Sequence, residues 1–284
     1  MIFKNINEGV KFKSTLVKAK LVTTEGSVPR DKGTIMLISE KYIFGSIGGG
    51  QLEYNIINKS LIFLKNNKFK EEIINIPLGP SIGQCCGGYV QVKITKHKDG
   101  KNSIQNENII NKNEESLYIF GAGHVGSELS LRSIDLDFKV NLIDSREEYL
   151  KVQENKKITN IYAKLPWLLV KNLKKNSFII VLTHSHDFDF KIINEVLKFN
   201  NFNFLGLIGS NTKKKKFENR LLKLGHKKSL IDKIECPIGL KSITSKKPAE
   251  IAISIIARLL EYRSNLSANV INHENILSKV NEKQ

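Results

Sequence analysis

Apolar residues in the first 96 positions fall mostly into short runs separated by turn residues, a pattern that predicts β-strands. One segment differs, because from Gln51 to Leu64 the apolar residues recur at helical spacing. The predicted strands are Leu16–Thr23, Thr34–Ile38, Tyr42–Ile47, Glu72–Ile76 and Tyr89–Thr95. Residues 1–96 are therefore expected to form a small mixed α/β domain.

A polar, asparagine-rich stretch from residue 97 to 116 lacks apolar periodicity and is typical of a linker. After it, strands and helices alternate up to residue 264, which indicates a parallel sheet covered by helices on both faces, as in a Rossmann-type domain. The predicted strands are Leu117–Phe120, Lys139–Ile143, Ile158–Tyr162, Phe178–Leu182 and Phe204–Ile208. The predicted helices are Val125–Arg132, Trp167–Leu173, Phe190–Phe199, Lys214–Leu224 and Pro248–Tyr262, and residues 265–284 are expected to be a polar tail.

Composition excludes several classes of protein. Apolar residues make up 40% of the chain, and no run approaches the roughly 18 apolar residues that span a bilayer, so no membrane insertion is expected. The amino-terminal residues lack the apolar core of a signal peptide, and three cysteines form no disulfide framework, which together favour the cytoplasm. The formal net charge of +17 invites a nucleic-acid function. No known nucleic-acid-binding motif accompanies that charge, so no nucleic-acid partner is expected.

A glycine-rich loop follows the first strand of the predicted parallel sheet and matches the pattern G-x-G-x-x-G. In this pattern Gly121 permits a tight turn, Gly123 lets the backbone approach a pyrophosphate, and Gly126 lets the next helix pack closely. Asp144 ends the following strand, where an acidic residue usually accepts a hydrogen bond from a ribose hydroxyl. His124 would lie near the phosphates or a substrate. The loop predicts a Rossmann fold but leaves open whether NAD, another nucleotide or no nucleotide binds.

Two histidines and two aspartates follow the fourth strand of that sheet. His184 and His186, with Asp187 and Asp189, could ligate zinc or another transition metal, and the string is similar to the metal motif of metallo-β-lactamase-like hydrolases. It departs from that motif because Phe188 stands at the aspartate position and Asp189 at the final histidine position. Two alternatives remain open, namely hydrogen bonds to a pterin, nucleotide or phosphate at the sheet edge, and simple capping of the next helix.

The amino-terminal domain carries a second glycine-rich segment, in which three consecutive glycines at positions 48–50 lead into the predicted helix. Backbone N–H groups at the start of a helix suit a phosphate or an oxyanion. Glu53, in the first turn, would also suit the helix dipole and need not be functional.

A third segment contains Cys85 and Cys86, which are adjacent and flanked by glycines before a strand. This pattern predicts an accessible loop, in which thiolates would be soft ligands for molybdenum or carriers of sulfur. The alternative is that both are small buried residues. Cys236 is solitary and is expected to be structural.

Eight segments of the chain, in order from Gly26 to Leu260, are similar to the successive motifs of the XdhC/CoxI family. They read GSVPRDKGTIML, GSIGGGQLE, LGPSIGQCCGG, YIFGAGHVG, VLTHSHDFD, GLIGSNTKKKKF, PIGL and PAEIAISIIARLL. The resemblance implies a small amino-terminal domain joined to a carboxyl-terminal Rossmann domain.

The resemblance also implies a function. Members of this family are accessory proteins that bind a molybdopterin-type molybdenum cofactor, assist the replacement of an oxo ligand by sulfur from a cysteine desulfurase, and deliver the cofactor to a xanthine dehydrogenase-type apo-hydroxylase. By this resemblance Cys85 and Cys86 would contact molybdenum or sulfur, and Arg30 would pair with a phosphate. The remaining implied cofactor-binding residues are Gly48, Gly49, Gly50, Gln51 and Gln84, with Gly121, Gly123, His124, Gly126, Asp144, His184 and His186 in the Rossmann domain.

Two other functions stay open at this point. A nicotinamide-dependent oxidoreductase would use the loop Gly121–Gly126 and Asp144, although nothing before residue 97 resembles a dehydrogenase substrate domain. A metal-dependent hydrolase would need zinc at His184 and His186. The sequence does not indicate which hydroxylase is the client, whether the pterin is a dinucleotide, or whether the chain forms a homodimer.

Overall fold

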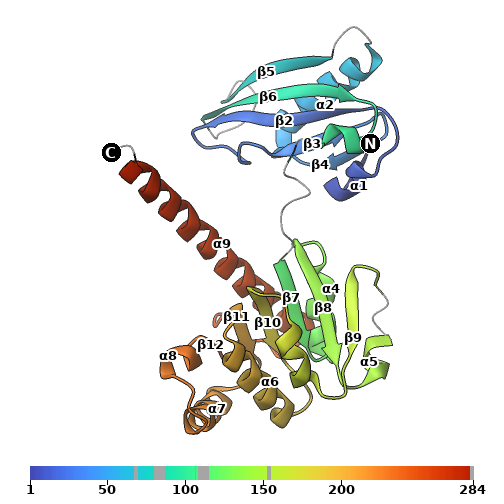
Figure 1. The fold of residues 1–284 in the computed structure, drawn as a ribbon. Coiled ribbons are helices and arrows are strands. Elements are labelled where there is room, and N and C mark those ends of the chain that lie inside the picture. Colours follow the sequence, from blue (N-terminus) through green and yellow to red (C-terminus); the bar gives the residue numbers. More distant parts are fainter. Residues whose placement is uncertain (67–69, 80–86, 106, 108–114, 152–154, 282–284) are drawn as a thin grey trace. The chain divides into compact units, whose positions relative to one another are not determined.

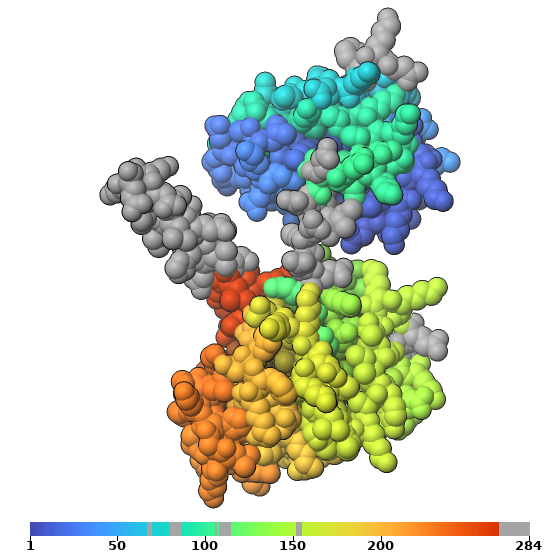
Figure 2. All heavy atoms as spheres, viewed as in Figure 1, coloured from blue at the N-terminus to red at the C-terminus, as the bar shows by residue number. Residues whose placement is uncertain are grey.

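The computed structural model of the chain describes all residues except 67–69, 80–86, 106, 108–114, 152–154 and 282–284, with side chains described as far as residue 266 (Figure 1). The chain divides into two compact units, Met1–Asn111 and Lys112–Gln284. Figure 2 shows the coloured atoms of the first unit in blue to bluish green and those of the second in green to red-orange. Each unit has its own hydrophobic core.

A six-stranded mixed sheet forms the amino-terminal unit, in the order β1-β4-β3-β2-β6-β5. All neighbours are antiparallel except β1, which runs parallel to β4. The strands are β1 (Ile2–Lys4), β2 (Leu16–Glu25), β3 (Ile35–Ile38), β4 (Tyr42–Gly45), β5 (Glu71–Leu78) and β6 (Gly88–His97). The five predicted strands are confirmed. Strand β1 was not predicted, because its residues are all exposed and carry no alternation of burial.

The long helix of this unit, α2 (Gly50–Lys65), packs its apolar face on β2 and β6. Leu52 and Ile56 of this face are almost fully buried, as the helical spacing of the sequence predicted. On the other face, α1 (Ile6–Val10) covers a smaller cluster centred on Phe44.

Part of the predicted linker, residues 97–116, is structured. The short helix α3 (Gly100–Ser103) packs against α1 so closely that a Cβ at Gly100 would overlap the carbonyl oxygen of Gly9. Farther along, Glu107 pairs with Lys18 at 3.0 Å and with Lys20 at 2.6 Å. These tertiary contacts join α3 and Glu107 to the amino-terminal unit.

A six-stranded parallel sheet forms the carboxyl-terminal unit, in the order β12-β11-β10-β7-β8-β9. Its first strand in the chain, β7, is central, and the strand order reverses between β7 and β10, as in the Rossmann fold. The strands are β7 (Glu115–Phe120), β8 (Phe138–Asp144), β9 (Ile158–Tyr162), β10 (Ser177–Val181), β11 (Phe202–Leu207) and β12 (Ile234–Glu235). The predicted Rossmann-type domain is confirmed.

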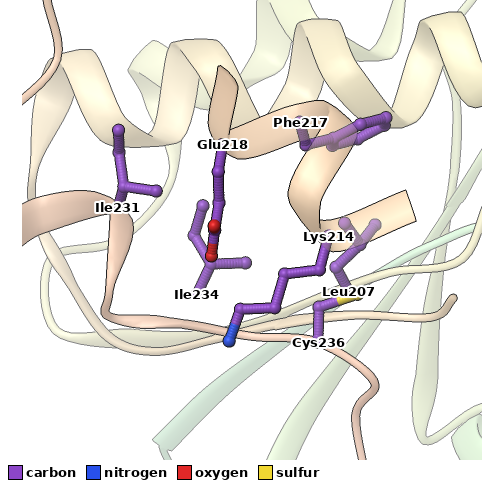
Figure 3. A pocket seen from close by; sticks show the side chains of 7 residues that line it. All are labelled: Leu207, Lys214, Phe217, Glu218, Ile231, Ile234 and Cys236. Atoms are coloured by element: carbon purple, nitrogen blue, oxygen red, sulfur yellow. The ribbon is translucent and has the colours of Figure 1, made fainter. Parts of the chain in front are cut away.

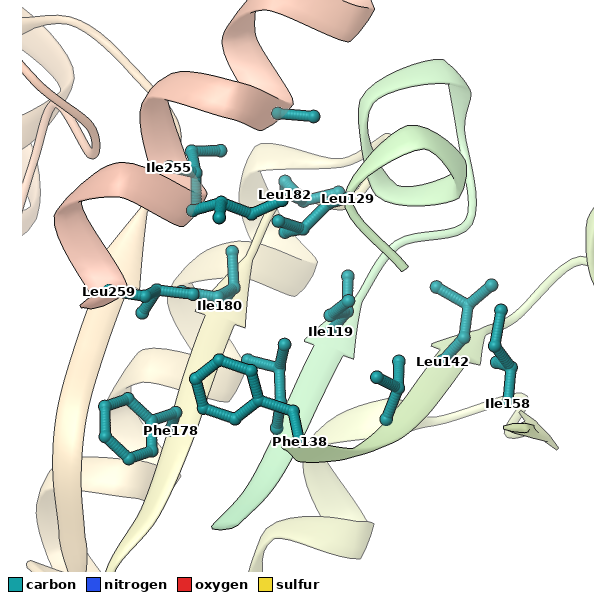
Figure 4. Packing of buried hydrophobic residues seen from close by; sticks show 14 of the residues in the cluster. Ile119, Leu129, Phe138, Leu142, Ile158, Phe178, Ile180, Leu182, Ile255 and Leu259 are labelled. Atoms are coloured by element: carbon teal, nitrogen blue, oxygen red, sulfur yellow. The ribbon is translucent and has the colours of Figure 1, made fainter. Parts of the chain in front are cut away.

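Helices cover both faces of the parallel sheet. On one face, Leu129 of α4 (His124–Ser133) and Ile255 and Leu259 of α9 (Pro248–Asn281) pack on β7 and β10 (Figure 4). The other face is covered by η2 (Pro166–Asn172), α6 (His186–Phe199) and α7 (Asn211–Lys223). Two short helices, α5 (Glu147–Lys151) and α8 (Lys228–Ile231), complete the unit. Helix α9 continues beyond its predicted end into residues 265–281.

No helix in the described part of the chain combines the length and the apolar character needed to cross a bilayer.

Candidate functional sites in the two units

The three glycines of the loop after β7 have different surroundings. A Cβ at Gly121, whose φ is +121°, would overlap the carbonyl oxygen of Leu182, and a Cβ at Gly126 would overlap the carbonyl oxygen of Gly121. Gly123 is the N-cap of α4, and a Cβ there would have no atom within 4 Å. Two glycines therefore allow close packing, whereas Gly123 leaves open space beside the backbone for a ligand.

Asp144, the last residue of β8, is only 3% exposed and is fully engaged by protein groups. Its Oδ2 accepts a hydrogen bond from the backbone N–H of Ala122 at 2.6 Å and one from Nη2 of Arg146 at 2.9 Å. Its Oδ1 accepts from the backbone N–H of Arg146 at 2.9 Å and from Nε of Arg146 at 3.0 Å. A carboxylate offers about four lone-pair positions, so these four bonds leave no acceptor for a ribose hydroxyl.

These bonds also control the ionisation of Asp144. Burial by itself would raise the pKa of Asp144, but the Arg146 side chain and the backbone N–H groups of Ala122 and Arg146 outweigh burial and lower the pKa. A group with a lowered pKa stabilises the folded state above its unfolded pKa, about 3.9 for Asp, and this contribution disappears as the pH falls through the lower folded value.

We expect Asp144→Asn to lower the free energy of unfolding at pH 7 by about 1–3 kcal/mol, because charge-assisted hydrogen bonds are lost. The difference from the wild type should shrink as the pH falls below about 4, since protonation then removes the same bonds in the wild type. Urea unfolding at pH 7 and pH 3 measures both values. Asp135→Asn, at an exposed carboxylate paired with Lys157, is the matched control and should change little at either pH. A difference that is the same at both pH values would contradict the assignment.

The loop after β10 lies directly beside the glycine loop, since the backbone N–H of Leu182 donates to the carbonyl of Phe120 at 2.9 Å. The structure thus brings together two of the predicted segments at the point where the strand order reverses. His184 and His186 are both exposed there. The ring of His184 packs edge-on against Phe188 at 5.4 Å between centroids. The ring of Phe188 in turn packs against Trp167 of η2 at 5.0 Å.

Asp189 has a different environment from these histidines. It is completely buried, and its Oδ2 pairs with Nζ of Lys213 at 2.6 Å. Its Oδ1 accepts from the backbone N–H and the hydroxyl of Thr183 at 2.9 and 2.7 Å. Lys213 also donates to the carbonyl of Ile208 at 2.9 Å. This network ties the loops after β10 and β11 together. Helix capping is done by Ser185, which accepts from the Phe188 N–H, rather than by an aspartate.

The histidine segment does not assemble a metal site among the residues that the structure describes, where no three His, Cys, Asp or Glu side chains come close enough to hold an ion. Asp187 pairs with Lys191 at 2.8 Å, and Asp189 is occupied by Lys213. The metal-dependent hydrolase hypothesis therefore has no ligand set in this part of the chain.

Three glycine-containing segments meet in the amino-terminal unit. A Cβ at Gly48 would overlap the ring of Pro29, so the turn that carries Arg30 lies against the start of α2. Ser27 of the same turn forms a β-bridge with Gly87. Cys85, Cys86 and Gln84 directly precede Gly87 in the sequence and lie outside the described residues. Arg30 is exposed.

The carboxylate of Glu53 already accepts some of the hydrogen bonds that this region can donate. The Oε2 atom of Glu53 accepts hydrogen bonds from the hydroxyl of Ser46 at 2.5 Å and from the N–H groups of Ile47 and Gly49 at 3.2 Å each. Gly49, the N-cap of α2, has no side-chain cap and no atom within 4 Å of its Cβ position. The first N–H groups of α2 itself are thus the donors left for an anion. The side chain of Gln51 is bonded to Asn55 instead.

Two cavities of the carboxyl-terminal unit are lined by none of the predicted cofactor-binding residues. The first, of about 10 Å³, holds no more than one water and is shown in Figure 3. Its lining residues are Leu207, Lys214, Phe217, Glu218, Ile231, Ile234 and Cys236. Burial there raises the pKa of the Cys236 thiol, which agrees with a structural role. The second cavity, of about 40 Å³, lies beside Val170 and Phe199.

Sequence reasoning missed three residues at the sheet edge. Arg146 saturates Asp144, and its position two residues after the acid was the available signal. Phe188 contacts the ring of His184, four residues earlier in the chain, and Trp167 in turn contacts Phe188. The contact between Trp167 and Phe188 joins two separate segments and carries no local pattern in the sequence.

Comparison with known proteins extends these observations. The family model described as the XdhC Rossmann domain matches residues 117–259, and the model described as the XdhC and CoxI family matches residues 13–73. The uncharacterized protein YqeB of Escherichia coli strain K12 is 26% identical over 255 residues, which are 87% of this chain. The chain covers only 43% of the length of YqeB.

A crystal structure of a Bacillus halodurans protein described as a xanthine dehydrogenase is also similar, with a TM-score of 0.76. The match covers 92% of this chain and 95% of that one at 20% sequence identity, a level that shows a shared fold. Because the two family models together match both units, in the order that the sequence motifs predicted, the chain belongs to the XdhC/CoxI family.

Proposed function

We propose that this chain is an accessory protein that binds a molybdenum cofactor of the molybdopterin type, assists its sulfuration and inserts it into a xanthine dehydrogenase-type hydroxylase. Membership of the XdhC/CoxI family suggests a role in xanthine dehydrogenase maturation. In this proposal the chain binds the cofactor, assists its sulfuration and delivers it. A cysteine desulfurase is the sulfur donor, and the cytoplasm is the compartment.

The observation that carries the proposal is the meeting of three segments in the amino-terminal unit. Gly48 lies against the turn of Arg30, and Ser27 of that turn is bridged to Gly87, the residue that follows the cysteine pair. The start of helix α2, the turn of the exposed Arg30 and the residue that follows the cysteine pair in the sequence are thereby neighbours, which supports a common site for the three segments. None of the three segments shows this convergence alone.

The donor set fits a pterin cofactor with a phosphate. Backbone N–H groups at the start of α2 and the Arg30 guanidinium would hold the phosphate, because both are donors suited to an anion. Cys85 and Cys86 would face the metal, since thiolates are soft ligands. When bound, the cofactor would supply the metal-centred chemistry of the client enzyme. The open space beside Gly49 would let the cofactor approach the protein backbone closely.

A nicotinamide-dependent oxidoreductase is not favoured. The four hydrogen bonds to Asp144 occupy the acceptor that a ribose hydroxyl of NAD would use.

The test is to purify the full chain from cells that make molybdopterin and to measure bound molybdenum and pterin per chain. We expect the wild type to carry both and Cys85→Ala and Cys86→Ala to lose roughly tenfold or more of the bound molybdenum, because even outer-shell partners of a metal contribute that much to affinity. Cys236→Ala is the matched control, since it removes a buried thiol of the carboxyl-terminal unit and should leave the metal content unchanged. A wild-type chain without pterin, or three variants with equal molybdenum, would refute the proposal.

A further inference from the structure

The carboxyl end of β8 presents a cation where an NAD-binding Rossmann fold presents an acceptor. Arg146 covers Asp144 with its Nε and one Nη2 hydrogen, and the carboxylate is 2% exposed beneath it. Arg146 itself is 26% exposed. A guanidinium has five N–H donors, so three of them remain without a partner among the described residues.

The position of Arg146 is set by its neighbours. The guanidinium carbon lies 3.8 Å from the centre of the Tyr149 ring, which is the distance of a stacked cation–π contact. Asp144 holds one edge of the guanidinium through two parallel bonds and is itself bonded to Ala122 of the glycine loop. Arg146 is therefore pre-oriented beside the glycine loop, with little conformational entropy to lose on binding a ligand.

The chemistry of the ligand follows from these donors. A ribose diol is mainly recognised by a carboxylate acceptor, and that acceptor is saturated here. A phosphate offers oxygens that match the planar fork of a guanidinium and form bidentate, charge-assisted bonds with it. In Rossmann folds an arginine near the end of the second strand can accommodate a phosphate on the ribose.

We propose that Arg146 makes this edge of the parallel sheet a binding site for a phosphate monoester, in the place where NAD-binding Rossmann folds accept a ribose hydroxyl. The phosphate could belong to a phosphorylated ribose or to a pterin side chain, since both present the same dianionic group. The site lies wholly within the carboxyl-terminal unit, so loss of the thiol site proposed for the amino-terminal unit would leave it intact.

The experiment is calorimetric titration of the full chain with adenosine 2′,5′-bisphosphate, adenosine 5′-monophosphate and inorganic phosphate. We expect the bisphosphate to bind roughly tenfold or more tightly than the monophosphate, as one or two charge-assisted bonds provide. Arg146→Ala should abolish this preference. If the source is a pterin phosphate, all three probes should bind with similar affinity through their phosphate, and Arg146→Ala should abolish the binding of all three.

Two further variants keep the test decisive. Arg146→Lys keeps the charge beside buried Asp144 but lacks the fork, so it should fold and should lose most of the preference. Arg132→Ala removes an arginine of α4 that pairs with Glu128 and should change nothing. The proposal is overturned if no probe binds to the wild type, or if both Arg146 variants bind like the wild type. It is also overturned if the monophosphate binds as tightly as the bisphosphate while inorganic phosphate does not bind.

Discussion

Replacing Asp189 by asparagine is expected to lower the free energy of unfolding of the carboxyl-terminal unit by about 3–5 kcal/mol, which corresponds to a fall in Tm on the order of 10 °C. The reason is that Lys213, with a side chain only 9% exposed, would keep its charge without a counter-ion. Trp167 is the single tryptophan of the chain and contacts Phe188 of α6, so its fluorescence during urea unfolding reports on this unit alone.

The matched control for this change lies two residues away. Asp187→Asn breaks an ion pair with Lys191 in the same helical turn, but both side chains are about half exposed. Exposed pairs contribute about 0–1 kcal/mol, so the control should unfold near the wild-type urea concentration. Replacing Asp189 and Lys213 together by leucine and methionine should recover part of the loss, because no unpaired charge then stays buried. Equal effects of Asp189→Asn and Asp187→Asn would contradict the role of the buried pair.

Gly126→Ala is the second substitution with a large expected effect, a loss of about 3 kcal/mol in the stability of the carboxyl-terminal unit. The new Cβ would overlap the carbonyl oxygen of Gly121, and a backbone atom at the start of α4 cannot move aside as a flexible side chain can. The strand–helix junction would have to open, so the same tryptophan fluorescence should show a lower urea midpoint.

Gly123→Ala provides the comparison within the same loop. Its φ is −69° and a Cβ there meets no atom within 4 Å, so the variant should fold with nearly wild-type stability. If Gly126→Ala were as stable as Gly123→Ala, the close approach of α4 to the loop would be wrong. If Gly123→Ala were strongly destabilised, the space beside this residue would not be open.

Much of the fold was predictable because the segments are locally consistent. The strands that form the middle of each sheet are apolar enough to be recognised individually, and the predicted helix Gln51–Leu64 differs from α2 by one residue at each end. The elements that were missed are short and depend on contacts with distant segments. Strand β1 is exposed and exists through its pairing with β4, and α3 exists through its close contact with Gly9.

The candidate sites were predictable to a smaller extent. The glycine patterns identified the loops correctly, because close backbone approach requires residues without a Cβ. They could not show what the neighbouring polar groups do. Asp144 was predicted to accept a bond from a ribose hydroxyl, yet it is saturated by Ala122 and Arg146. Glu53 was expected only to suit the helix dipole, yet it bonds to its own loop.

By itself the sequence determined the two-domain α/β organisation, the Rossmann-type sheet and the family. These properties depend on residue periodicity and on motif order, and both can be recognised in the linear sequence. Only the tertiary structure decided which polar groups remain available to a ligand, because hydrogen bonds form between segments that are far apart in the sequence. Arg146 became a candidate for phosphate binding for that reason. Its remaining donors matter because the acceptor beside it, Asp144, is partly filled by Ala122, 22 residues before Asp144 in the chain.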